Sequence, residues 1–189
     1  MRLLCALTAS TVAAGLHGPV VHCVSAATAL DLVPGTDVED PRRSYVKLRS
    51  KLKRPADAAE LYSRIVLNAV VGNTGDHHWN TSLRQVGRRD WELSQLYDVL
   101  PFFERRGVPT FRMDITRQRP SRAANRANLL AAGRQLTSLD EAAAWAVVVK
   151  TSTYVRDHWQ RVFLKHSELH GDARPDEWAK VFEHDWLAG

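Results

Sequence analysis

The sequence predicts a mainly helical fold built as one domain. Its 189 residues have the length of an ordinary domain, and 44% of them are hydrophobic, which is enough for a core. Helix-forming residues dominate, and the glycine-punctuated β-rich pattern of a sandwich or barrel is missing. Two short segments suited to strands, at 81–86 and 91–93, add a β-hairpin to the predicted helical bundle.

The first residues are apolar and small, and they end at the turn signal Pro34-Gly35. Arg2 and the LLCALTASTVAAGL that follows it resemble a weak secretory signal, although the positive region is one residue long and polar residues interrupt the apolar stretch. We expect 1–23 to be a divergent N-terminal segment, with removal as a signal peptide as the alternative.

The rest of the composition indicates a cytoplasmic protein. Cys5 and Cys23 are the only cysteines, too few for a disulfide scaffold, so a reducing compartment is the simplest interpretation. No apolar run reaches the roughly 20 residues that a membrane-spanning helix needs. The formal net charge of +5 favours anionic partners without choosing among them.

Two helices are predicted before the hairpin. In the segment 42–53, apolar residues recur at helical spacing with basic residues on the other face. Pro55 opens the second helix, at about 56–71, which becomes almost wholly apolar toward its C-terminal end. Gly72 is a good stop signal. The polar stretch GNTGDHHWN, at 72–80, therefore follows a firmly anchored helix.

After the hairpin comes QLYDVLPFF, at 95–103, in which Asp98 is the one carboxylate among apolar neighbours. Burying such a group is costly unless it is paired or bound to a metal. A strand is predicted at 111–115, and helices are predicted at about 121–133, 138–153, 154–168 and 175–187.

The polar loop and the isolated aspartate beyond a hairpin have the layout of a phosphoryl-transfer site of the protein-kinase type. In such a site a loop aspartate accepts the proton of the substrate hydroxyl, an asparagine five residues later binds Mg²⁺, and a second aspartate binds the metal that bridges the phosphates.

The sequence also resembles a known family. VLNAVVGNTGDHHWN followed by WELSQLYDVLP resembles the C-terminal domain of the HipA-like serine/threonine kinases, the toxins of bacterial type II toxin–antitoxin systems. The resemblance spans about 24–189. Residues that match the family pattern N-x-D-[DA]-H-x-x-N or its YDV-x-P string are Asn73, His77, Asn80, Tyr97, Asp98, Val99 and Pro101.

The resemblance implies a kinase-like C-terminal lobe with ATP and Mg²⁺ as cofactors. Asn80 and Asp98 would be the metal ligands, and His77 would lie at the cofactor. The catalytic aspartate is expected five residues before Asn80, where this chain has Gly75. Asp76 is the neighbour that would substitute for it, and loss of a general base typically costs roughly 10²–10⁴ in rate.

The resemblance also implies an N-terminal lobe that covers the phosphates, and the residues before the loop contain no glycine-rich phosphate motif. We therefore expect a truncated toxin kinase lobe, acting on a protein substrate and weak or inactive alone. The first alternative is a non-catalytic pseudokinase module that binds a HipB-like antitoxin or a separate N-lobe, with nucleic acid reached only indirectly. The second is a degraded, non-functional product.

Each candidate residue also has a plain structural interpretation. The plain alternative for the loop at 72–80 is a helix-capping segment, and for Asp98 it is a salt bridge to an arginine; the match to both family motifs favours the kinase-type interpretation of each. His166 and His170, four residues apart with Glu168 between them, fit a solvated helical face, because a zinc protease would need glutamate directly after the first histidine, where this chain has Ser167. Tryptophans 145, 159, 178 and 186 fit core packing, and the arginines between 105 and 126 fit a solvated surface.

Overall fold

A computed structural model describes residues 21–33, 40–88, 90–101, 107–117 and 121–165, together with Ala179, Phe182, His184 and Leu187. Within these residues the chain folds into five helices and one small three-stranded sheet, so the predicted mainly helical class is confirmed. Among the same residues, no helix is both long enough and apolar enough to cross a membrane.

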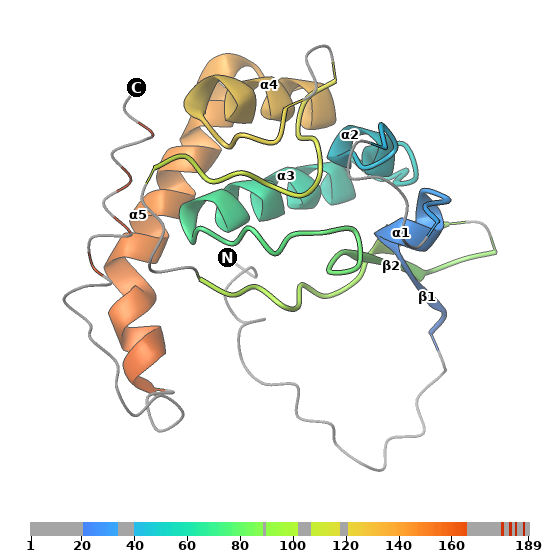
Figure 1. The fold of residues 1–189 in the computed structure, drawn as a ribbon, viewed down its shortest axis with the longest axis horizontal. Coiled ribbons are helices and arrows are strands. Elements are labelled where there is room, and N and C mark those ends of the chain that lie inside the picture. Colours follow the sequence, from blue (N-terminus) through green and yellow to red (C-terminus); the bar gives the residue numbers. More distant parts are fainter. Residues whose placement is uncertain are drawn as a thin grey trace.

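Three long helices form the centre of the molecule: α3 (Pro55–Val70), α4 (Arg126–Thr137) and α5 (Glu141–Lys165). Each of the three contacts the other two, and Figure 1 shows α4 lying along one side of α3 while α5 crosses its end. The short helix α2 (Tyr45–Arg49) contacts α3 and α4 at the opposite end of α3, whereas α1 (Ala26–Ala29) packs against β1 and β2.

Helix α3 is the element that the sequence predicts best. Pro55 occupies its first turn, and Asp57 complements the positive end of the helix dipole there. Its last turns are buried on all sides, including Ile65, which is fully buried. Gly72 follows with φ 68°, the left-handed conformation that ends helices and that glycine adopts without strain.

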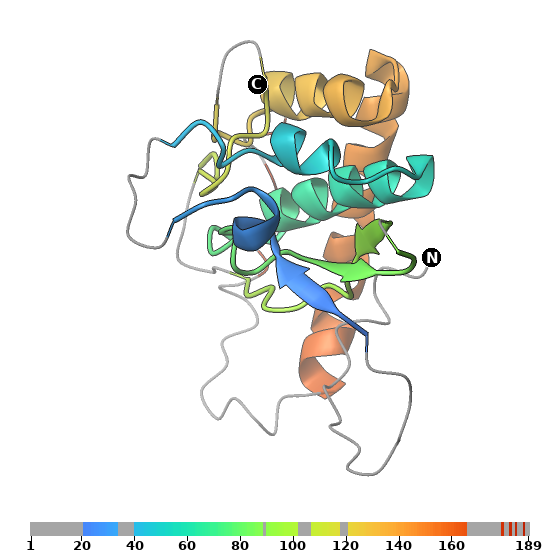
Figure 2. The same cartoon turned by 90° about the vertical axis from the view of Figure 1, so that its right-hand side faces the viewer.

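The sheet has the order β1-β2-β3 and is antiparallel throughout (Figure 2). The predicted hairpin is confirmed as β2 (Ser82–Gln85) and β3 (Trp91–Leu93), with Leu83 opposite Leu93. Strand β1 (Cys23–Ser25) pairs with β2 and was not predicted, because three residues carry too little pattern to indicate a strand.

Three predicted elements differ in the structure. The segment 111–115 is not a strand, although the isolated bridge between Ser44 and Asp114 ties it to the start of α2. Helix α2 is shorter than 42–53. Helix α4 begins at Arg126 rather than near residue 121, because the Asn125 side chain caps it by accepting from the backbone N–H of Asn128.

The two helices predicted at 138–153 and 154–168 are one continuous helix, α5, as far as Lys165. No glycine or proline interrupts 141–165, so nothing in that stretch breaks the helix. The helix predicted at 175–187 falls largely outside the described residues, as do His166, His170, Trp178 and Trp186. Trp145 and Trp159 pack against the core, as predicted.

Gly133 lets α4 approach α3 and α5 closely, and we expect Gly133→Ala to destabilise the fold by about 1–3 kcal/mol. A Cβ there would lie 2.6 Å from the Ala144 Cβ and 3.0 Å from the Tyr62 Cζ. This overpacking outweighs the gain of up to about 1 kcal/mol in helix propensity. Urea unfolding measures the change. Arg134→Ala, on the exposed side of α4, is the control and should change stability by less than about 0.5 kcal/mol.

Candidate functional site

The polar loop begins from a fixed point at the end of α3. The backbone N–H of Asn73 donates to the carbonyl of Asn68 over 2.8 Å, and its side-chain amide donates to the Asn68 side chain over 3.0 Å. The Asn73 side-chain oxygen in turn accepts from the backbone N–H of Gly75. Asn68 is buried in α3, so the first turn of the loop is held by the core.

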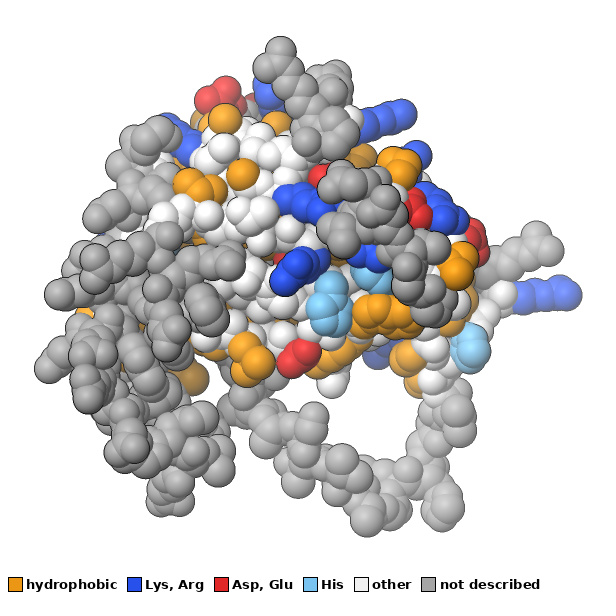
Figure 3. All heavy atoms as spheres, in the orientation of Figure 1, with side chains coloured by type: hydrophobic (Ala, Val, Ile, Leu, Met, Phe, Trp, Pro, Cys, Tyr) orange, Lys and Arg blue, Asp and Glu red, His pale blue; other side chains and the backbone are white. Residues whose placement is uncertain are grey.

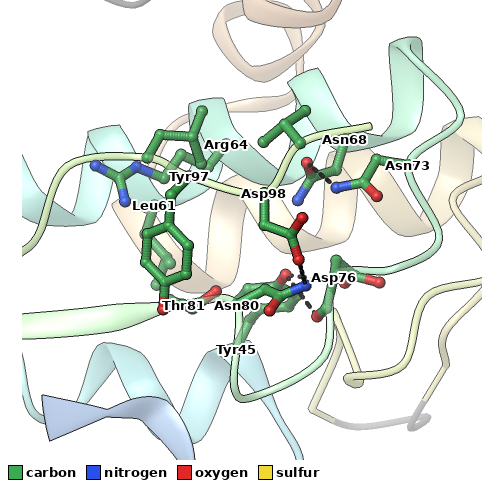
Figure 4. Close-up of a pocket in the computed structure, with 12 residues that line it drawn as sticks. Tyr45, Leu61, Arg64, Asn68, Asn73, Asp76, Asn80, Thr81, Tyr97 and Asp98 are labelled. Atoms are coloured by element: carbon green, nitrogen blue, oxygen red, sulfur yellow. Dashed lines mark hydrogen bonds between the residues drawn. The ribbon is translucent and has the colours of Figure 1, made fainter. Parts of the chain in front are cut away.

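Asp76 holds the middle of the loop. Its side chain is 2% exposed, and Figure 4 shows it beside Tyr45. One carboxylate oxygen accepts from the Tyr45 hydroxyl over 2.8 Å, and the other accepts from the backbone N–H of Arg112 over 3.0 Å. Burial raises the pKa of Asp76 to about 6, against the opposing effect of these hydrogen bonds.

This geometry does not favour Asp76 as the substitute for a catalytic aspartate. Both of its oxygens are already hydrogen-bonded, and a general base must reach the proton that it removes. Its evident contribution is to position the loop. Gly75, one residue earlier, is exposed and lies where a family catalytic aspartate is expected.

Asn80 and Asp98, the two predicted metal ligands, meet directly. The Asn80 side-chain amide donates to one carboxylate oxygen of Asp98 over 2.5 Å and to the carbonyl of Gly75 over 2.8 Å (Figure 4). Asp98 has φ 53°, a left-handed conformation that costs free energy outside glycine. Strain of this kind is concentrated at functional sites.

Tyr97 sets the register between the two segments. Its hydroxyl donates to the carbonyl of Trp79 over 2.7 Å and lies 2.6 Å from the Ser82 hydroxyl. The tyrosine precedes Asp98 in the chain, while Trp79 precedes Asn80. This bond therefore fixes the two backbone positions that carry the facing side chains.

Arg64, on α3, holds the segment at 94–99 that follows β3 and carries Asp98, called the Asp98 segment below. Its guanidinium donates to the carbonyl of Ser94 over 2.6 Å and to the carboxylate of Glu60 over 2.9 Å. Because its side chain is almost fully buried, these bonds form away from water and hold the chain that leaves β3.

Asp76, Asn80 and Asp98 line one small cavity, which α3, the loop and the Asp98 segment enclose (Figure 4). Its volume of about 10 Å³ is the room of a single water molecule or cation. Further lining residues come from α2, α3, the polar loop up to β2 and the segment that follows β3: Tyr45, Leu61, Arg64, Asn68, Asn73, Thr81, Leu96, Tyr97 and Val99.

His77, the predicted cofactor contact, does not line this cavity. Its Nδ1 accepts from the backbone N–H of Trp79 over 3.3 Å, so a neutral ring carries its proton on Nε2 and presents a donor there. The face in Figure 3 shows histidine, basic and hydrophobic side chains side by side. Trp79 is 46% exposed.

The residues present fit a hard divalent cation held jointly with a ligand. No group of three or more His, Cys, Asp or Glu side chains that could hold a metal occurs in the part of the chain that the structure describes. One carboxylate and one amide oxygen are nevertheless the donor types that Mg²⁺ takes when phosphates and waters complete its shell. A half-turn of the Asn80 amide would present its oxygen to the ion.

The alternative of a salt bridge at Asp98 finds no support among the described residues, since no lysine or arginine described there pairs with it. Arginines in the basic region have other contacts: Arg122 pairs with Asp114, and Arg126 lies over the ring of Trp145. Arg105, Arg106 and Arg119 lie outside the described residues.

Sequence reasoning missed the groups that hold the loop. Tyr45 lies on the apolar face of the helix predicted at 42–53, and a tyrosine there brings a hydroxyl into the core. Asn68 and Arg64 are polar residues in the buried part of α3. Because polar groups buried in a helix need partners, their presence in an apolar stretch could have indicated that they hold a neighbouring segment.

Comparison with known proteins decides the family. The family model described as the HipA-like C-terminal domain matches residues 17–160. The chain belongs to this family. A solved structure from Shewanella oneidensis MR-1, a complex of the toxin–antitoxin proteins HipA and HipB with operator DNA, contains a similar chain with a TM-score of 0.60 and 16% sequence identity. No curated protein matches the sequence.

The similarity to the Shewanella chain covers 92% of this protein but only 45% of that chain. At this identity it shows a shared fold. This HipA-like C-terminal domain therefore corresponds to somewhat less than half of the solved chain, and residues of both segments that resemble the family motifs line the cavity just described.

We expect Asp76→Asn to remove one component of the pH dependence of stability. The folded-state pKa of about 6 lies above the reference value of 3.8, so the folded protein holds this proton more tightly than the unfolded chain does. The resulting stabilisation is fully present below about pH 4 and is lost as the pH rises through about 6. The change is about 3 kcal/mol.

Urea unfolding of both proteins between about pH 4 and pH 8 measures this effect. The free energy of unfolding of wild type relative to Asp76→Asn should fall across this window and level off above about pH 7. A difference that stays constant with pH would contradict a buried carboxyl group with a raised pKa.

Proposed function

We propose that this protein is a HipA-like protein serine/threonine kinase lobe that holds Mg²⁺ and the phosphates of ATP between Asn80 and Asp98, and that it is weak or inactive alone. The observation that carries the proposal is the direct contact of these two side chains, 18 residues apart in the chain. The resemblance of the two motifs to those of the HipA-like kinases supports the proposed reaction class, and the donor set suits the metal.

Asn80 and Asp98 would hold Mg²⁺, which would supply positive charge to neutralise the phosphates of the nucleotide. The protein's own part in this is positioning. Asp98 is held by the Tyr97 hydrogen bond and by the Arg64 contact to Ser94, while Asn80 is held by the carbonyl of Gly75. Asp76 keeps the loop on α2 and leaves its tip exposed to a substrate hydroxyl.

The missing part of the chemistry is a proton acceptor. Gly75 has no side chain, Asp76 is committed to two hydrogen bonds, and the Nδ1 of His77 accepts from the backbone N–H of Trp79. We therefore infer slow or absent turnover. The same observation favours a second candidate function, a non-catalytic pseudokinase module that binds a partner.

The partner that we propose for such a module is a HipB-like antitoxin or a complementary N-terminal lobe. The Shewanella HipA chain was solved together with HipB and operator DNA. The present domain, which shares that fold over 92% of its length, is proposed to contact an antitoxin in a comparable assembly and to approach DNA only through it.

If Asn80 and Asp98 hold Mg²⁺, replacing either side chain should weaken the binding of nucleotide. Isothermal titration with a non-hydrolysable ATP analogue should give binding that requires Mg²⁺, and Asn80→Ala and Asp98→Asn should each weaken it at least about tenfold, or 1.4 kcal/mol. Asp90→Asn is the matched control, because Asp90 is an exposed carboxylate on the hairpin whose partner is Lys53.

That control should bind as well as wild type. Binding that does not depend on Mg²⁺, or an equal loss in all three variants, would remove the support for a metal site at Asn80 and Asp98.

An aspartate at position 75 requires a small shift of one side chain. A Cβ built on Gly75 would lie 3.3 Å from the Asn73 side-chain oxygen, a tight contact that this side chain relieves by moving a few tenths of an ångström. We expect the wild-type chain to incorporate no labelled phosphate with Mg²⁺ and ATP. Gly75→Asp, supplied with the N-terminal lobe of a HipA-like kinase, should raise turnover by about 10² or more.

Thr74→Asp is the control for position, since it adds the same carboxylate one residue away. A folded Gly75→Asp complex that is no more active than wild type would show that residue 75 is not the catalytic position. Robust incorporation by wild type alone would contradict the inactive lobe.

A further inference from the structure

Arg112 lies beside the exposed tip of the polar loop, although 36 residues separate it from Asp76 in the chain. Its backbone N–H donates to one carboxylate oxygen of Asp76 over 3.0 Å. Gly75, the residue before Asp76, is exposed. The side chain of Arg112 therefore starts next to the place where the proposed function brings a substrate hydroxyl.

The backbone around Arg112 is fixed. Its neighbours Phe111 and Met113 are almost fully buried, whereas Arg112 itself is exposed. The backbone N–H of Asp114 donates to the carbonyl of Arg43 over 2.8 Å and joins this segment to the residues before α2. These contacts hold an arginine at the surface on the side of the loop tip.

The Arg112 guanidinium makes no ion pair with a carboxylate among the described residues. The carboxylate of Asp76 is 2% exposed and accepts from the Tyr45 hydroxyl and from the Arg112 backbone. Burial is the main influence on the pKa of Asp76 and raises it, while the positive charge of Arg112 acts in the opposite direction. The loop thus lies in the field of a cation that is available to an anion from another molecule.

Trp79 adds an apolar surface on the same loop. It is 46% exposed, and its ring lies with its centroid 5.2 Å from that of the buried His78 ring. The Trp79 carbonyl accepts from the Tyr97 hydroxyl over 2.7 Å, and the Trp79 backbone N–H donates to Nδ1 of His77. A tryptophan held in this way offers a large contact area at little cost in conformational entropy.

The places of Arg112 and Trp79 restrict their ligand. Neither residue lines the cavity between Asn80 and Asp98, so both lie outside the position proposed for Mg²⁺ and the nucleotide phosphates. They lie by the loop tip, where the acceptor segment of a substrate must arrive. An extended segment covers about 7 Å in two residues, so side chains that close to the acceptor can reach groups around the tip.

We propose that Arg112 and Trp79 select the acceptor segment of a protein substrate, Arg112 by binding an acidic side chain and Trp79 by binding an apolar one, each within about two residues of the acceptor serine or threonine. A guanidinium is suited to a carboxylate, and an indole ring to apolar contact. The inference rests on the proposed function, because kinase chemistry is what brings a hydroxyl to the loop. Arg112 is then a specificity-determining residue and not only part of a solvated surface.

NMR titration of the ¹⁵N-labelled protein with two peptides, without nucleotide or Mg²⁺, tests the inference. The peptides ALFSEEA and ALFSKKA share the apolar half and the acceptor serine and differ only in charge. ALFSEEA should bind at least about fivefold more tightly. It should shift the amide signals of Gly75 and Arg112 first, because these amides lie where the peptide binds.

Variants separate the two contacts. Arg112→Gln should reduce the preference for ALFSEEA to less than about twofold, and Arg112→Glu should reverse it, because a carboxylate there attracts the lysines. Trp79→Ala should weaken the binding of both peptides by the same factor, since apolar contact does not distinguish their charges. Circular dichroism checks that each variant is folded, and Arg112→Gln alone decides if Arg112→Glu does not fold.

Arg117→Gln is the matched control. Arg117 is exposed on the same segment, and its backbone N–H also donates to a side-chain oxygen, that of Gln135, over 2.7 Å. The control removes the same charge as Arg112→Gln at a position that does not contact the loop. It should leave the preference within about twofold of that of the wild-type protein.

Three results would overturn the proposal: no preference of the wild-type protein for ALFSEEA at up to millimolar peptide, a preference that survives Arg112→Gln, or equal losses in Arg112→Gln and Arg117→Gln. The last would mean that net charge alone attracts the peptide. Failure of the kinase proposal is recognised separately, because the nucleotide titrations of Asn80→Ala and Asp98→Asn contain no peptide and these titrations contain no nucleotide.

Discussion

The carboxylate of Asp76 joins three parts of the chain that are distant in sequence: the polar loop, helix α2 through the Tyr45 hydroxyl, and the segment at Arg112 through its backbone N–H. It does so at 2% exposure, where removing a carboxylate from water raises its pKa to about 6. Because an unpaired group there would be costly, the loop has one favourable position against the core.

The position of Asp76 sets what the rest of the site can do. With the loop fixed, Asn80 points toward the segment beyond β3, and the Tyr97 bond to the Trp79 carbonyl places Asp98 opposite it. The two side chains proposed to hold a cation thus face each other, while Gly75 stands where the family resemblance implies a proton acceptor. On the proposed function, the lobe would bind a metal–nucleotide more readily than it would catalyse phosphoryl transfer.

Local sequence patterns were sufficient for α3, its glycine stop and the hairpin, because each is specified by neighbours along the chain. They also picked out Asn80 and Asp98, through two motifs that resemble a family. Local patterns did not predict the features that depend on residues far apart in the sequence. Strand β1 exists only by pairing with β2, and the partners of Asp76 lie 31 and 36 residues away from it. The hydrogen bonds of Asn68 and Arg64 depend likewise on the folded arrangement.

The convergence of Asn80 and Asp98 on one ion is tested most directly by adding Mn²⁺ to the ¹⁵N-labelled protein and following its amide signals by NMR. The account predicts that substoichiometric Mn²⁺ broadens first the signals of the loop around Asn80 and of the segment around Asp98, together and equally. Broadening of only one of these segments, or first broadening at exposed carboxylates such as Asp90 and Asp157, would contradict it.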